Sequence, residues 1–107
     1  MNLFRRKVHH VNEIGDTDAY SARDAIARTR IKVIGTVLRI RKKPADGLPA
    51  LIVTIGDDDG RVQAHWSGRN SLPGIALGAR IIIEGVASPT SSGLVFLNPL
   101  FEIVNVH

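Results

Sequence analysis

The sequence predicts a mainly all-β protein: a five-stranded Greek-key barrel preceded by a short N-terminal helix. Two observations lead to this fold class. From residue 28 onward, short runs alternate apolar and polar residues and are joined by turn residues with no helix between them, which excludes a parallel β/α architecture. Five strands are few for a two-sheet sandwich, whereas a long, bent first strand is how a small barrel closes.

The chain is expected to form one domain. Its 107 residues can bury one core but not a core and a second catalytic lobe, and 44% apolar with 22% charged residues is typical of a globular protein. We expect a tail and a short helix in residues 1–27 and the barrel in residues 28–107. The sequence contains no cysteine, which excludes disulfides and thiolate metal sites.

The segment before the barrel favours a short helix. Asp16, Thr17 and Asp18 offer N-cap oxygens, and residues 19–27 are rich in alanine and contain neither glycine nor proline. This helix is expected to end before the alternating pattern that begins at Ile31.

The first strand changes phase within its length. Ile31 and Val33 are apolar on one parity, whereas Leu38 and Ile40 are apolar on the other. A bulge centred on Gly35 would account for this slip, and glycine also permits the close backbone approach that a sharply bent strand requires.

The next two strands are predicted to form a hairpin, turned at Asp57-Asp58-Asp59-Gly60, where such residues tolerate tight turns. A loop over residues 67–78 leads to a fourth strand, Arg80 to Val86, and a fifth begins at Leu94 and is interrupted at Asn98-Pro99. In the hairpin, apolar residues at alternate positions are expected to face the core: Leu51, Val53, Ile55, Val62, Ala64 and Trp66.

Positive charge is concentrated in and around the first strand. The formal net charge is +4, and residues 28–43 hold seven basic side chains and no acidic one. Such a block favours an anionic partner by long-range attraction. A solvated strand edge that resists pairing with other molecules is an equally good interpretation of the block alone.

The order of the motifs resembles the OB-fold nucleic-acid-binding domains, particularly the wedge domain of RecG-type helicases and the short stand-alone bacterial OB-fold proteins. The resemblance spans about residues 28–104 and rests on five segments in order: Gly35–Val37, Leu51–Gly60, Val62–Trp66, Leu77–Gly85 and Asn98-Pro99. It implies binding of single-stranded or branched nucleic acid across the outer face of the second and third strands. The flanking loops would be Lys43 to Ala50 and Ala87 to Gly93.

On this basis we expect arginine and lysine side chains to hold phosphates, and Gln63 and His65 to contact bases. Arg69 either clamps a phosphate or is solvated. Trp66 either stacks on a base or packs at the barrel end with its indole N–H bonded to a carbonyl or a water, and its core parity favours packing. The predicted nucleic-acid-binding residues are Arg39, Arg41, Lys42, Lys43, Thr54, Arg61, Gln63, His65, Trp66 and Arg69.

No catalytic residues, cofactor or metal site are predicted. The histidines at 9, 10, 65 and 107 lack ligand spacing, and the Asp57 turn lacks the alternating ligands of a calcium loop. We find no secretory signal and no apolar run of membrane-spanning length, so a cytoplasmic location without membrane contact is expected.

The predicted function is therefore non-enzymatic binding of single-stranded nucleic acid, DNA in preference to RNA. With only five aromatic residues in the chain, binding is expected to be weak and to have little sequence selectivity. The main alternative is a protein–protein interaction adaptor, which gains from the outward parity of the apolar residues Ile52 and Ile82. A binder of small molecules or oligosaccharides ranks last, and the sequence does not indicate an oligomeric state.

Overall fold

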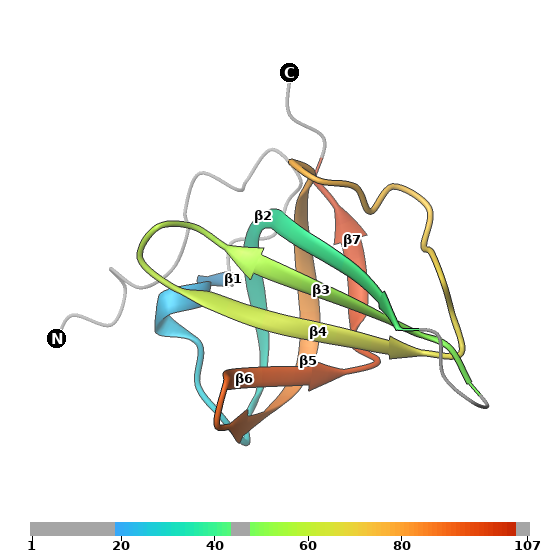
Figure 1. Ribbon diagram of the computed structural model, residues 1–107. Helices are drawn as coiled ribbons and strands as arrows, with labels where there is room; N and C mark the ends of the chain where they lie inside the picture. The colour runs from blue at the N-terminus through green and yellow to red at the C-terminus, as the bar shows by residue number, and fades with distance from the viewer. Residues whose placement is uncertain (1–18, 44–47, 105–107) are drawn as a thin grey trace, which may run out of the picture.

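The computed structural model describes residues 19–43 and 48–104, which form mainly β-sheet and contain no helix of seven residues or more. Seven strands and one short 3₁₀ turn follow one another in the described part of the chain (Figure 1). Their bounds are β1 Ala19–Ser21, the 3₁₀ turn η3 Ala22–Asp24, β2 Arg30–Lys43, β3 Ala50–Gly56, β4 Arg61–Ser67, β5 Arg80–Thr90, β6 Gly93–Leu97 and β7 Leu100–Ile103.

Five of these strands form a closed ring, in the order β2, β3, β4, β6, β5 and back to β2 (Figure 1). The long strand β2 closes it because its two halves have different partners. Residues 30–36 pair with β5, and residues 36–43 pair with β3, so Thr36 lies opposite both Arg80 and Gly56. The pair β4–β6 is parallel, whereas the other four pairs of the ring are antiparallel.

The inside of the ring holds the main apolar core. The six hairpin residues predicted to face the core are all buried, with exposed fractions between 0% and 5%, and Phe96 is completely buried beside them. The predicted hairpin turn is also confirmed, because the Oδ1 atom of Asp57 accepts hydrogen bonds from the backbone N–H groups of Asp59 (2.8 Å) and Gly60 (3.2 Å). Period-two alternation thus predicts this part of the fold correctly.

Two further strands extend the sheet outside the ring: β1 pairs in parallel with β2, and β7 pairs antiparallel with β5. A second, smaller apolar cluster lies where these strands join the sheet and consists of Ala19, Ile34, Ile82 and Val104. The expectation that Ile82 is an exposed apolar residue is therefore wrong, because this residue is only 3% exposed. Its strand has a partner that the sequence pattern did not reveal.

The bulge in β2 lies three residues after its predicted position. The register with β3 shifts between Val37 and Arg39, so Leu38 is the extra residue. The other role predicted for Gly35, a close approach between strands, is confirmed. A Cβ atom at this position would lie 2.7 Å from Cγ2 of Ile55 and 2.9 Å from the backbone nitrogen of Gly56, so a larger residue does not fit there.

The helix predicted for residues 19–27 is not confirmed. Residues 19–21 form a strand, residues 22–24 form η3, and the proposed caps at 16–18 lie outside the described residues. Helix propensity is a weak preference, and so short a helix is marginal without tertiary support. Here pairing with β2 and burial of Ala19 and Ala22 against the sheet favour the extended chain.

The interruption predicted at Asn98-Pro99 separates β6 from β7. Asn98 adopts a left-handed backbone conformation with φ of 49°. Its backbone N–H donates to the carbonyl of His65 (2.6 Å), and its Oδ1 atom accepts from the N–H of Ser67 (2.9 Å). This residue therefore ties the end of β4 to the turn between β6 and β7.

Replacing Gly35 by alanine should destabilise the protein, because the new methyl group would overlap Ile55 and the backbone of Gly56. Overpacking of this kind costs about 1–3 kcal/mol. Urea denaturation measures the loss. Gly85→Ala is the matched control, since a Cβ there meets only ordinary contacts at 3.5 Å or more. Equal stabilities of the two variants would contradict the close approach.

Candidate nucleic-acid interface

Three rungs of paired residues cross β2, β3 and β4 on the outside of the ring. Residues directly opposite each other in antiparallel strands project to the same side of the sheet. The first rung is Arg39, Thr54 and Gln63, the second is Arg41, Ile52 and His65, and the third is Lys43, Ala50 and Ser67. We call this surface the basic face and define it by seven residues: Arg39, Arg41, Lys43, Thr54, Arg61, Gln63 and His65.

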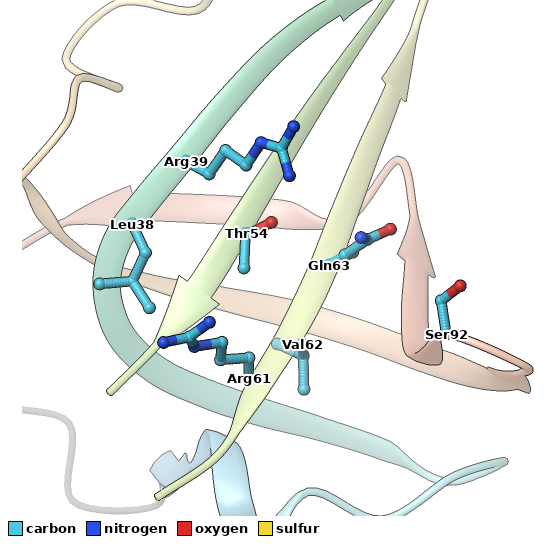
Figure 2. A pocket seen from close by; sticks show the side chains of 7 residues that line it. All are labelled: Leu38, Arg39, Thr54, Arg61, Val62, Gln63 and Ser92. Atoms are coloured by element: carbon cyan, nitrogen blue, oxygen red, sulfur yellow. The ribbon is translucent and has the colours of Figure 1, made fainter. Parts of the chain in front are cut away.

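A groove of about 540 Å³ lies at one end of the basic face, lined by Leu38, Arg39, Thr54, Arg61, Val62, Gln63 and Ser92. Figure 2 shows Arg39 and Arg61 reaching over β3 from the strands on either side, with Thr54 between them. Four predicted site residues therefore line one groove. Its floor and walls offer guanidinium, hydroxyl and amide groups, which can donate hydrogen bonds to phosphate or base oxygens.

The cations of the basic face have no counter-charge in the described part of the chain. Arg39, Arg41, Lys43 and Arg61 form no ion pair there, whereas Arg30 pairs with Glu84 and Arg23 lies 3.9 Å from Asp59 elsewhere on the molecule. Like charges gathered on one surface repel one another, and an anion bound between them relieves that repulsion.

His65 is held by its neighbours in the middle of the basic face. Its Nε2 atom lies 2.9 Å from Oε1 of Gln63, so the two polar side chains form a hydrogen-bonded pair. Burial of the ring, and then repulsion from Arg41 and Lys43, lower the pKa of His65 below its ordinary value of 6.5. The neutral form of the imidazole is therefore favoured, and a neutral ring can accept as well as donate a hydrogen bond.

Three predicted site residues do not join this surface. Lys42 pairs with Leu51, which pairs with Trp66, so this rung projects to the inner side of the strands. Trp66 is 5% exposed, and its indole N–H donates to the carbonyl of Pro99 at 2.9 Å, which confirms the packing role that its parity favours. Arg69 is exposed in the loop after β4 and lines a different groove.

Sequence reasoning missed three of the groove residues, Leu38, Val62 and Ser92. Leu38 faces the groove because it is the bulged residue, and Ser92 arrives from the turn between β5 and β6 only when the ring closes. Ile52, expected to be exposed, is 8% exposed and stands between Arg41 and His65 in its rung. The flanking loop from Ala87 to Gly93 could have indicated Ser92, whereas nothing in the local pattern marks Leu38 or Val62.

The described part of the N-terminal segment leaves the basic face open. Strand β1 lies along residues 32–34 of β2, and η3 packs at the Asp57 turn, where a Cβ on Gly60 would lie 2.5 Å from Cα of Arg23. No residue from 19 to 29 lines the groove. Residues 44–47 of the other flanking loop lie outside the described residues.

Comparison of the sequence with known protein families and with curated proteins finds no match. Within residues 19–43 and 48–104, no three histidine or acidic side chains are grouped so that they could hold a metal ion. In the same ranges, no helix has the length and apolar character needed to cross a membrane.

The pKa of His65 should lie below 6.5 in the folded protein, and Arg41→Ala should raise it by removing repulsion. NMR titration of the imidazole protons measures both values, with His65→Gln identifying the signal. Since the unfolded chain keeps the ordinary value, the unfolded state binds this proton more readily, and stability should fall as the pH falls below 6.5. Lys42→Ala, on the inner side, is the control, and an equal rise in both variants would contradict the assigned cause.

Trp66→Phe should lower the free energy of unfolding by about 1–3 kcal/mol, because the carbonyl of Pro99 loses its buried donor. Chemical denaturation measures this loss. In an oligonucleotide-binding assay, the folded variant and the unchanged protein should give the same result. A variant of unaltered stability that no longer binds would instead assign Trp66 to base stacking.

Proposed function

We propose that this protein is an OB-fold that binds single-stranded nucleic acid through the basic face. The observation that carries the proposal is the grouping of four cations without ion-pair partners in the described chain beside Thr54, Gln63 and His65. Phosphates provide the missing negative charge, and bases provide hydrogen-bonding edges for the polar side chains.

The strand order of the ring supports the OB-fold. Counted along the chain, the first ring strand pairs with the second and the fourth, and the third pairs in parallel with the fifth. We infer from this order a Greek-key closure of the five strands. In OB-folds the face of strands two and three and the loops that flank it bind oligonucleotides. The corresponding strands here are β3 and β4, which contribute Thr54, Arg61, Gln63 and His65.

Phosphate contacts are the main source of affinity in this proposal. Arg39, Arg41 and Lys43 occupy alternate positions of β2, about 6.7 Å apart along the strand. An extended nucleic-acid backbone can place successive phosphates near such a row. Aromatic stacking contributes little, because Trp66 and Phe96 are buried in the core. The complex is therefore weak, sensitive to salt and little affected by base sequence.

The adaptor alternative loses the residues that favoured it. Ile52 and Ile82 were expected to be exposed, and they are 8% and 3% exposed. DNA in preference to RNA, the absence of catalysis and a cytoplasmic location remain predictions from the sequence.

A labelled single-stranded oligonucleotide should bind with an affinity that falls steeply as salt rises. Each phosphate neutralised in a single strand contributes about −0.7 to the slope of log K against log salt, so four cations should give a slope of about −3. Fluorescence anisotropy over a salt series measures this slope. No binding at low salt, or binding that is indifferent to salt, would overturn the proposed function.

Lys43→Ala and Lys42→Ala form a matched pair of adjacent, exposed lysines on opposite sides of β2. Lys43→Ala should reduce the magnitude of the salt slope by about 0.7, whereas Lys42→Ala should leave the slope nearly unchanged. The same anisotropy titration compares them. Equal effects would mean that only net charge matters and that the basic face is not the binding surface.

A further inference from the structure

The end of the ring opposite the Asp57 turn is only partly covered. The inward rung of Lys42, Leu51 and Trp66 lies at this end. The segment between β4 and β5 runs past it as an open loop (Figure 1), because its proline and glycines at 73, 74 and 78 do not favour a helix. Leu72, 7% exposed, is the one residue of this loop that is buried in the core.

Two grooves flank Leu72, and we call them the loop grooves. The first, of about 490 Å³, lies between the loop and β2 and includes Ile40, Lys42, Leu72, Ile75 and Leu77. The second, of about 370 Å³, lies between the loop and β7 and includes Trp66, Arg69, Leu72, Pro73, Leu100 and Phe101. The three predicted site residues that do not join the basic face thus border these two grooves.

The loop grooves expose large apolar side chains to solvent. Leu77 is 67% exposed beside the first groove, and Leu100 is 62% exposed beside the second. Neighbouring exposed apolar side chains around a hollow are typical of a surface that docks another molecule.

The charge of the grooves restricts what that molecule can be. Among the described residues, Lys42 and Arg69 are the only charged ones that line the grooves, no acidic residue lines either groove, and neither cation forms an ion pair. In the part of the chain that the structure describes, each groove therefore presents an apolar wall with one cation that forms no ion pair. A matching ligand combines apolar groups with negative charge.

A protein segment fits these features better than nucleic acid does. The described residues of the first groove include no aromatic ring on which a base could stack. In the second, Trp66 is buried and meets Phe101 edge to face, with ring centres 5.6 Å apart and planes at 72°, so the tryptophan faces are not open. We propose that the loop grooves bind a short segment of a partner protein that carries both large apolar side chains and carboxylates.

To test this proposal, a displayed library of random short peptides is selected for binding to the whole chain, and the enriched peptides are then synthesised. The enriched sequences should combine aspartate or glutamate with large apolar residues. Their affinity, measured by anisotropy, should fall about tenfold or more for the double variant Lys42→Glu with Arg69→Glu, since each carboxylate would then face a like charge. Leu77→Ser, at an exposed apolar position, should also weaken binding and serves if the charge variant fails to fold.

The matched control is Arg39→Glu with Arg41→Glu, which makes the same charge change on the basic face. It should leave peptide affinity within about twofold while abolishing oligonucleotide binding. The proposal would be overturned if no peptide is enriched, if enriched peptides bind the loop-groove variants and the unchanged protein equally, or if an oligonucleotide displaces them. Loss of oligonucleotide binding in Leu77→Ser, which leaves the charge unchanged, would equally overturn it, by assigning the grooves to nucleic acid. Failure of the proposed function alone would leave the peptide result unaffected.

Discussion

The whole architecture depends on one strand, β2, being shared between two sets of partners. Its first half pairs with β5 and its second half with β3, and the exchange occurs at Thr36. The chain can pass from one partner to the other because Gly35 has no side chain to meet Ile55. Only this double pairing brings β6 against β4 and closes the ring around its apolar core.

The stabilising core and the basic face are physically separate in this molecule. The buried residues of the described chain are apolar, with no buried charged or polar side chain among them, so hydrophobic burial within the ring stabilises the fold. The basic face lies outside that core and makes few contacts of its own, apart from the hydrogen bond between Gln63 and His65. Its composition can therefore change without a large effect on the fold, and a ligand can approach it without disturbing the core.

The parts of the structure that follow from local alternation could be predicted from the sequence, whereas those that follow from closure could not. The period of two in β3 predicts that Leu51, Val53 and Ile55 face the core, and the residues of the Asp57 turn predict the hairpin. The alanines in residues 19–27 predicted a helix that does not form, because pairing of residues 19–21 with β2 overrides their weak local preference for helix. Ser92 reaches the groove only because β6 pairs with β4, a strand distant from it in the sequence, which no local pattern encodes.

Basic residues illustrate the same limit. A run of consecutive cations looks like one patch in a sequence, but neighbouring residues of a strand project to opposite sides, so Lys42 lies apart from Arg41 and Lys43. Arg69 lies beyond the end of β4, in the loop between β4 and β5. Alternation could have separated Lys42 from its neighbours, but which of the two sets faces outward depends on the position of the bulge.

That bulge acts like a frame shift in the sheet. Before it, the inward residues of β2 are the odd-numbered Ile31, Val33 and Val37, and after it they are the even-numbered Ile40 and Lys42. Val37 and Arg39 pair with the consecutive residues Ile55 and Thr54, so Leu38 takes no place in the alternation. If Leu38 were paired like its neighbours instead, the side chains of the outward cations would face the core. The bulging of this single residue thus determines whether the strand carries an exposed charged surface or a buried charge that the fold could not tolerate.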